Sequence, residues 1–451
     1  MLAMGIDHYI DMQLHPESVP EDPTLAQQLA ALGTLKLDPE DILAHDIRPE
    51  AGANGGSDKD TLKARREAID REAIDQRYLR AIESTRQLQE VMVDFWFNHF
   101  NVFCCSKGLF VRPLVGSFEL EAIRPHVLGR FRDLLGATAH HPAMLVYLDN
   151  ERNIVRRGEG DAQRGLNENY AREVMELHTL GADGGYTQGD VMSLARILSG
   201  WRLPPPNHVE QGKHGFYFDA TVHAPGTKTF LGQVIAEGGE AEGERALDML
   251  ARSPATARHI AYQLAQYFVA DEPDPALVEL LARRFTETDG DIRAVLAALF
   301  KSPEFWQPAA IGDKFKTPYE YVVSAIRATG QPVSDGVLVG DQVTAEGERL
   351  YGKMTPDGYK NAATAWLSPD AMTERIIFAN KLASGRLPLA RPFDASGHDP
   401  QHDYHGEPVD EATVKASLDG IFSQHTLDTV ARAKGPLRAA LLLASPEFMM
   451  R

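Results

Sequence analysis

Apolar residues recur along most of the chain with the spacing of an α-helix, and no sustained set of alternating apolar and polar positions is present. Residues three and four apart share one face of a helix, whereas a half-buried strand needs a period of two. The pattern therefore predicts a mainly α fold, a multi-helix globular array with little or no sheet.

Five helical segments are predicted in the first half of the chain. The first covers residues 83–100, where His99 continues a stripe of apolar side chains. The fifth begins at Thr187, which has capping-box spacing to Asp190, and it stops before Gly200. The three segments between them cover residues 118–138, 141–150 and 167–180.

Residues 201–232 break this pattern with prolines, histidines and aromatic residues. We expect a long irregular segment with room for one hairpin, and long ordered loops in compact proteins are often functional. Helical spacing then returns, most clearly at residues 253–269, 274–288 and 291–301. The tetrapeptide SPEF starts at Ser302 and again at Ser445, and Ser followed by Pro predicts a repeated helix N-cap.

These features predict three regions along the chain. Residues 1–80 form an N-terminal helical region, and residues 81–235 form a helical core that carries most motifs and a cleft-forming loop. Residues 236–451 form a C-terminal helical region that packs on this core. The 451 residues, 43% of them hydrophobic, are enough for a sizeable core and more than one packing unit.

Charge and composition exclude several classes of function. Asp and Glu total 64 against 46 Lys and Arg, a formal net charge of −18, so attraction to nucleic acid or anionic lipid is not expected. No run reaches the roughly 18 apolar residues of a membrane helix, and the given start shows no export signal. The only cysteines, Cys104 and Cys105, are adjacent, which excludes a disulfide framework and favours buried thiols.

The stretch NENYAREVMELHTLG, residues 167–181, holds the strongest candidates for chemistry. On a regular helix Glu168, Arg172 and Glu176 form consecutive i,i+4 pairs, which fits a solvated ladder of ion pairs. Glu173 and His178 instead fall among apolar positions. A carboxylate buried there needs a cation, a donor or a raised pKa.

Two interpretations of these residues stay open. Glu173 is either a tuned general acid or base or a structural carboxylate that holds neighbouring helices through an arginine. His178 and His99 are either core histidines with satisfied hydrogen bonds or, together with Glu173, an acid/base or metal cluster. A divalent metal ion is the one cofactor that these residues suggest. No HExxH or Glu-x-x-His pair is present, so the sequence signal for a metal site is weak.

The irregular segment adds further polar candidates, again weighed against solvated loop residues. They are His208, His214, His223 and Lys228, with Trp201 at its start. The chain contains no phosphate-binding glycine loop, no G-x-S-x-G elbow and no dinucleotide fingerprint. Nucleotide-driven and serine-hydrolase chemistry are therefore disfavoured.

Several long motifs resemble one family in its own order along the chain. They are DFWFNHFNV, FELEAIRPHVLGRFRDLL, HPAMLVYLDN, LNENYAREVMELHTLGADGGYTQGDV, ARILSGW, GTKTFLG, GDIRAVLAALFKSPEFW and the closing SPEF. Together they resemble the bacterial domain-of-unknown-function family 1800 over nearly the whole chain. The resemblance implies export to the periplasm, a start that has lost an earlier helix, and a partner protein of phosphatase- or sulfatase-like fold.

The family pattern carries over to many polar positions without assigning their roles. They are Asn98, His99, Asn167, Glu168, Asn169, Arg172, Glu173, Glu176, His178, Asp190, Arg196, Trp201, His223 and Lys228. One departure is Ala224, which stands where the family usually has an acid after the loop histidine.

The leading hypothesis is an all-helical acid/base hydrolase or lyase, metal-assisted if a metal binds, that acts on a carbohydrate-type substrate. Its expected catalytic residues are Glu173, His178 and His99. Its expected substrate-binding residues are Asn98, Asn167, Glu168, Arg172, Glu176, Tyr186, Arg196, Trp201, His223 and Lys228, with Tyr186 and Trp201 as stacking surfaces. The alternative is a non-catalytic helical scaffold that binds a partner enzyme and uses the same polar residues as buried structural networks.

Overall fold

The computed structural model describes residues 4–47, 56–108, 110–155, 165–206, 209, 212–307, 312–390, 406–418 and 420–451. It is 61% helical and 4% strand, so the predicted mainly α fold is confirmed. Within the described residues, no helix is both long and apolar enough to cross a membrane.

The α-helices fall into two runs on either side of the strands. Up to residue 200 they are α1 (Ile6–Leu14), α2 (Pro23–Ala31), α3 (Pro39–Asp41), α4 (Gly56–Glu83), α5 (Gln87–His99), α6 (Val115–Ser117), α7 (Phe131–His140), α8 (Pro142–Tyr147), α9 (Asn169–Glu176) and α10 (Gln188–Ile197). After residue 236 they are α11 (Glu240–Ala251), α12 (Pro254–Phe268), α13 (Pro275–Glu287), α14 (Ile292–Lys301), α15 (Pro318–Thr329), α16 (Gly336–Ala345), α17 (Pro369–Ala383), α18 (Glu411–Ser417), α19 (Gln424–Arg432), α20 (Leu437–Leu443) and α21 (Pro446–Met449).

The strands lie in the segment predicted to be irregular. They form two antiparallel pairs, β1 (Trp201–Arg202) with β2 (Tyr217–Phe218) and β3 (Lys228–Phe230) with β4 (Gln233–Ile235). Both pairs are two or three residues long, in keeping with the prediction of little sheet.

Three predicted helices begin or end elsewhere than their apolar spacing indicated. The first starts at Gln87 rather than residue 83, because the Ser84 hydroxyl accepts the Arg86 N–H and ends the regular backbone. The segment 118–138 is divided: a π-helix covers Phe118–Ile123, a 3₁₀ turn contains Pro125, and α7 starts only at Phe131. The third, α9, ends at Glu176, four residues early.

Local capping signals are confirmed by the side chains. Thr187 and Asp190 form a reciprocal capping box at the start of α10. The Ser445 hydroxyl accepts the Phe448 N–H at α21, and the Ser302 hydroxyl accepts the Phe305 N–H in the same way. Each SPEF motif is therefore a capping device, as predicted.

The cysteines match their prediction only in part. Cys104 is buried and Cys105 is exposed, and their Sγ atoms lie 3.2 Å apart. Cys104 therefore packs in the core as predicted, whereas Cys105 does not.

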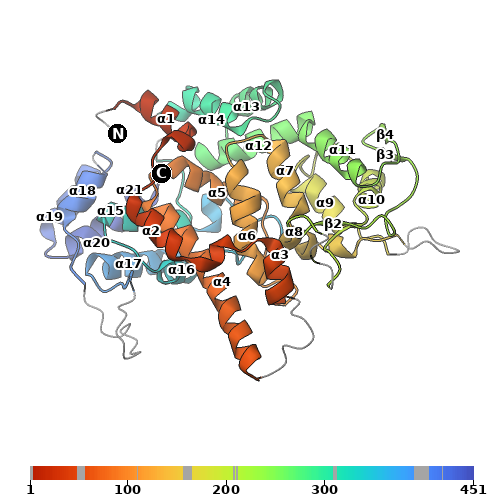
Figure 1. Ribbon diagram of the computed structural model, residues 1–451. Coiled ribbons are helices and arrows are strands. Elements are labelled where there is room, and N and C mark those ends of the chain that lie inside the picture. Colours follow the sequence, from red (N-terminus) through yellow and green to blue (C-terminus); the bar gives the residue numbers. More distant parts are fainter. Residues whose placement is uncertain are drawn as a thin grey trace.

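Two hydrophobic cores organise the helices. The first joins α5 and α7–α14, and the second joins the end of α4 to α15–α21. Figure 1 shows α15–α20 on one side of the molecule and α9–α11 with the small sheets on the other, with α5 between them. The predicted boundaries at residues 80 and 235 stay predictions, although residues 240–300 share the first core with the preceding segment.

Helix α5 is tied to both cores through one buried arginine. Arg77 on α4 is 1% exposed and donates to Asp94 on α5 at 2.7 Å and to Glu119 at 3.0 Å. Arg124 binds Glu119 as well, together with Glu90 of α5. Breaking such a buried network leaves an uncompensated charge, so it fixes the position of α5 and of the polar residues at its carboxyl end.

Candidate functional site

The carboxyl end of α5 opens onto a cavity of about 270 Å³. Its walls are the ends of α5 and α9, one face of α12, and the segment 357–361, which lies far away in the sequence. The cavity brings together His99 and Glu176 from the predicted set with His259, Gln263 and Asp357. Asn98, a third predicted candidate, lines the same cavity.

Asn98 holds one wall of this cavity in place, and its side-chain amide is hydrogen-bonded to the protein. Its side-chain amide donates to the Tyr359 carbonyl at 2.8 Å and accepts the Tyr359 N–H at 2.6 Å. Gly358, at φ +65°, packs against it so closely that a Cβ would lie 2.2 Å from the Asn98 carbonyl oxygen. Only glycine fits there, and the turn that carries Asp357 is thereby held on α5.

His99 sits at the bottom of the cavity as a neutral ring. Burial and the neighbouring His259 lower its pKa to about 3. Its Nε2 lies 3.1 Å from the His178 carbonyl oxygen, which can only accept, so Nε2 donates. Its Nδ1 must then accept, and the Gln263 amide, 2.7 Å away, satisfies it by turning its NH₂ group to the ring.

His178 lies in the closed core and does not reach the cavity. It is 1% exposed, its ring contacts Phe100 and His99, and its Nε2 has no hydrogen-bond partner. Burial and the two neighbouring histidines lower its pKa well below the ordinary value. The expected catalytic role therefore has no route to solvent.

The backbone at His178 departs from the predicted regular helix for a local reason. The prediction assumed a regular helix to residue 180, but after Glu176 the backbone widens into a turn in which the N–H of His178 bonds to the Glu173 carbonyl. The Thr179 hydroxyl donates to the Val174 carbonyl at 2.6 Å and stabilises this turn. Side chains beyond Glu176 are consequently rotated from their helical positions.

Three carboxylates gather at the edge of the cavity. Glu176 of α9 and Asp357 of the opposite segment line it, and Glu173, three residues before Glu176 on α9, lies close enough to both for their charges to act on it. Glu173 is half-buried, and burial, with the charges of Glu176 and Asp357, raises its pKa. This agrees with the prediction that Glu173 needs a cation or a raised pKa.

The pKa of Asp357 is shifted in the opposite direction. Burial opposes its ionisation, but hydrogen bonds from the Lys360 ammonium at 2.7 Å and the Thr355 hydroxyl at 2.5 Å outweigh it and lower its pKa. Two carboxyl groups with pKa values moved apart by their surroundings are the arrangement of an acid and a base at one site.

Other predicted residues of the 167–186 stretch serve the surface and the helix ends. Glu168 and Arg172 form an exposed ion pair at 3.0 Å, and Gln188 bonds to both. The predicted Arg172–Glu176 pair is absent from the described contacts, because Glu176 turns to the cavity and accepts from the Tyr186 hydroxyl at 3.4 Å. The Asn167 side chain caps α9 by accepting the Asn169 N–H.

Trp201 and Arg196 do not reach the cavity. Trp201 is fully buried, stacks on His140 at 4.5 Å, and would meet any Cβ at Gly243. The predicted stacking surface is thus covered by protein. Arg196 on α10 is half-buried, and its Nε has no hydrogen-bond partner.

His223 and Lys228 belong to a separate, closed network around Glu242 of α11. The Lys228 ammonium lies 2.6 Å and the His223 Nε2 3.2 Å from the Glu242 carboxylate, and all three residues are at least nine-tenths buried. Hydrogen bonds from Lys228, the Gly238 N–H and His223 outweigh burial and lower the pKa of Glu242. Glu242 gives Lys228 a carboxylate partner although residue 224 is alanine.

Two further sequence predictions concern the loop histidines and a metal site. His208 lies outside the described residues, and His214 is 81% exposed, 3.9 Å from Glu121. In the described part of the chain, no three His, Cys, Asp or Glu side chains are arranged to hold a metal ion. The metal role expected for His99, His178 and Glu173 thus finds no geometric support.

Sequence reasoning missed Asp357, Lys360, His259 and Gln263. The signal at Asp357 was a Pro356-Asp357-Gly358 turn, which marks a loop but not its neighbours. His259 and Gln263 are i,i+4 on α12, and Gln263 contacts the predicted His99 directly. Only the packing of α12 on α5 makes these residues part of one site.

Comparison with known proteins identifies one family. Residues 1–450 match the family described as Protein of unknown function (DUF1800). No curated protein and no solved structure matches the chain.

Proposed function

This chain belongs to the DUF1800 family, and we propose that it is an acid–base hydrolase that cleaves glycosidic bonds of a carbohydrate-type substrate at the α5–α9–α12 cavity. The observation that carries the proposal is the contrast between Glu173, whose pKa is raised, and Asp357, whose pKa is lowered. Glycoside hydrolysis requires one protonated and one ionised carboxyl group on either side of the scissile bond.

Each carboxyl group has a defined part in the reaction. Glu173, protonated, donates its proton to the glycosidic oxygen as the bond from that oxygen to the anomeric carbon breaks. Asp357, ionised, takes a proton from the water whose oxygen forms the new bond to the anomeric carbon. The products are two free sugar hydroxyls, and a second proton exchange with solvent restores both carboxyl groups.

The remaining lining supports a polyhydroxylated substrate. Gln266, Asn361 and Glu176 offer donors and acceptors to hydroxyl groups, and Phe95 and Tyr359 offer apolar ring surfaces for a sugar face. His99 and Gln263 are already bonded to each other, and His99 also bonds to the His178 carbonyl and Gln263 to the His259 ring, so they hold the cavity floor in place. Glu176 has a further effect, because its charge adds to burial in raising the pKa of Glu173.

One observation favours the scaffold alternative. Lys228, His223, Trp201 and Arg172, all expected to bind substrate, have protein partners in the structure. Such satisfied networks are what a helical scaffold needs in order to present a surface to a partner of phosphatase- or sulfatase-like fold. The hydrolase proposal gives Glu173 and Glu176 of α9 a part in the reaction, whereas the scaffold alternative makes them structural.

The test is substitution of each carboxyl group followed by assay on purified polysaccharides. Glu173→Gln and Asp357→Asn should each lower turnover by about 10²–10⁴-fold, the usual contribution of a general acid or base. Release of reducing ends reports hydrolysis, and ultraviolet absorbance of an unsaturated product reports elimination. Glu287→Gln, the same chemical change on exposed α13, is the matched control.

Thermal unfolding of the same variants separates the two functions. The hydrolase proposal expects both variants to unfold within a few degrees of the native chain. Loss of folding in both, together with no turnover by the native chain on any polysaccharide, would support the scaffold. An ultraviolet-absorbing product in place of reducing ends would change the reaction class to a lyase.

A further inference from the structure

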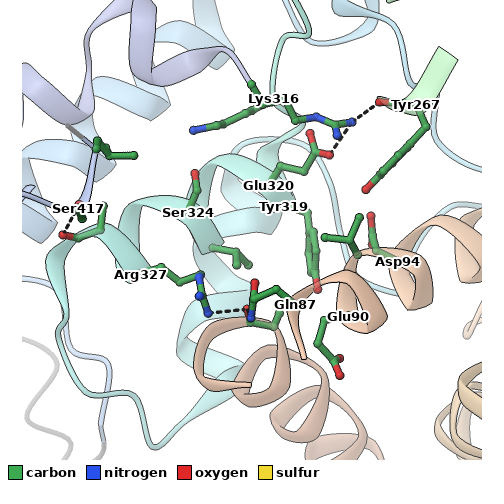
Figure 2. A pocket seen from close by; sticks show the side chains of 16 residues that line it. Gln87, Glu90, Asp94, Tyr267, Lys316, Tyr319, Glu320, Ser324, Arg327 and Ser417 are labelled. Atoms are coloured by element: carbon green, nitrogen blue, oxygen red, sulfur yellow. Dashed lines mark hydrogen bonds and ion pairs between the residues drawn. The ribbon is translucent and has the colours of Figure 1, made fainter. Parts of the chain in front are cut away.

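A second and larger cavity, of about 440 Å³, lies where the two hydrophobic cores meet. Figure 2 shows its lining side chains, which come from α5, from α12 and from α15 with the residues next to it. Tyr319, Val91, Val323 and Leu418 give it mostly apolar walls. Its size falls in the range of small-molecule sites, and no residue expected from the sequence to act in catalysis or binding lines it.

Every carboxylate that lines this cavity already has an arginine partner. Glu320 pairs with Arg451 at 2.9 Å, and the Thr317 N–H bonds to its other oxygen. Glu90 pairs with Arg124 and Asp94 with Arg77, each at 2.7 Å. The acidic groups are therefore neutralised by the protein itself.

Two cations of the lining lack such a partner. Lys316 is 8% exposed, and its ammonium donates to the Phe448 carbonyl at 2.7 Å and lies 4.0 Å above the Phe448 ring. No carboxylate of the described residues lies within ion-pair distance of it. Arg327 donates only to the backbone carbonyls at the end of α4, Ala81 and Ile82.

A buried ammonium with one acceptor is costly, because it has three donors and has lost its water. Burial lowers the pKa of Lys316 to about 8, although the charge of Glu320 opposes this. The nearby cations, Arg451 and Arg375, add to the local positive charge. An anion placed beside Lys316 would fill the unused donors and balance this charge.

We propose that this cavity is a binding site for a small monocarboxylate with an apolar or aromatic body. The carboxylate binds the Lys316 ammonium, which is buried without a carboxylate partner beside an open cavity. The body packs against Tyr319, Val91, Val323 and Leu418, which line the cavity. A phosphate or dianion fits less well, because only one unpaired ammonium lies in these walls and Arg327 is held by α4.

The site is independent of the proposed hydrolase. It shares Asp94, Tyr267 and Tyr319 with a small intervening cavity, and that cavity shares Asn98 and Tyr359 with the carboxylate cavity. Neither Glu173 nor Asp357, the two carboxyl groups assigned to catalysis, lines this second cavity, and Glu176 does not line it either. Binding can therefore be measured without any assay of turnover.

The experiment compares octanoate and 3-phenylpropanoate with their neutral amides by isothermal titration calorimetry on the full chain. Both carboxylates should bind the native chain, and each amide should bind at least about tenfold more weakly, a difference of about 1.4 kcal/mol. Lys316→Gln should remove this preference, and Lys301→Gln, an equal charge change on α14, should preserve it. Ser324→Leu, which narrows the cavity and keeps the charge, should weaken both carboxylates.

Three results would overturn the proposal. They are no binding of either carboxylate by the native chain up to millimolar concentration, equal binding of acid and amide, and unchanged binding of octanoate by Lys316→Gln. Circular dichroism shows whether Lys316→Gln folds. If it does not, the comparison of acid with amide on the native chain and on Ser324→Leu decides alone.

Discussion

Two lysine–carboxylate pairs with nearly equal nitrogen–oxygen distances have different roles in this molecule. Lys228 and Glu242 lie 2.6 Å apart with side chains 2% and 1% exposed, whereas Lys360 and Asp357 lie 2.7 Å apart with side chains 63% and 32% exposed. In the first pair the Lys228 ammonium also donates to the Ala224 carbonyl, and His223 bonds to the Glu242 carboxylate. In the second pair the carboxylate borders a cavity and two further carboxylates. Because the two nitrogen–oxygen distances are nearly equal, the pairs differ in burial and in the open space beside the carboxylate. The closed pair stabilises the fold, and the open pair is the candidate for catalysis.

The largest expected difference between the pairs is in stability. Lys228→Met leaves the Glu242 carboxylate buried without its ammonium, and we expect a loss of about 3–5 kcal/mol in the free energy of unfolding. Lys360→Met, the same substitution at the open pair, should cost about 1 kcal/mol or less. Urea denaturation followed by circular dichroism measures both values, and similar losses at the two positions would remove the distinction.

A second difference concerns the response to acid. His178 is closed in the core and its pKa is lowered well below 6.5, so it stays neutral in the folded chain. The unfolded chain binds a proton at this residue below pH 6.5, and stability is therefore lost as the pH falls below that value. One such histidine contributes about 1.4 kcal/mol per pH unit.

His178→Phe tests this contribution, because phenylalanine is similar in shape and removes the unpartnered Nε2. The variant should lose less stability than the native chain between pH 6.5 and 5, measured by urea denaturation at each pH. His425→Phe on exposed α19 is the control. An unchanged slope in His178→Phe would mean that the ring is not held neutral.

The open pair should instead govern the pH profile of turnover. Lys360 lowers the pKa of Asp357, so Lys360→Met raises that pKa and moves the acidic limb of activity to higher pH. The charge of Glu176 raises the pKa of Glu173, so Glu176→Gln lowers that pKa and moves the alkaline limb to lower pH. Carboxyl titration by ¹³C NMR measures both shifts without turnover, and shifts in the opposite direction would contradict the assignment of acid and base.

Sequence patterns predicted the fold better than the site because folding signals are local. Capping at Thr187 and Ser445 depends on residues three positions away, and both caps are present. The mainly helical fold likewise depends on the spacing of neighbours. The end of α9 was missed because the Thr179 hydroxyl competes for a helix carbonyl, which apolar spacing does not record.

The site depends on contacts that no spacing encodes. Glu173 was identified from its place among apolar residues, but its partner Asp357 lies on a turn held by Asn98 through two hydrogen bonds. His178 was placed among apolar residues in the same way and is indeed buried, but only the structure shows that it is closed off from the cavity that Glu176 and Asp357 line. A buried, fully bonded lysine such as Lys228 and an open one such as Lys360 also look alike in sequence, since burial is a tertiary property.

The smallest expected effect is at the exposed pair on the same helix as Glu173. Glu168 and Arg172 lie 3.0 Å apart and are 40% and 36% exposed, so solvent screens their attraction. Arg172→Ala should therefore change the free energy of unfolding by less than about 1 kcal/mol, and added salt should reduce the change further. Urea denaturation in low and high salt measures it, with Gln188→Ala as a control that removes the other partner of Glu168 without changing charge. A loss as large as that of Lys228→Met would show that exposure does not separate the two kinds of pair, because Arg172 and Lys228 would then stabilise the fold equally.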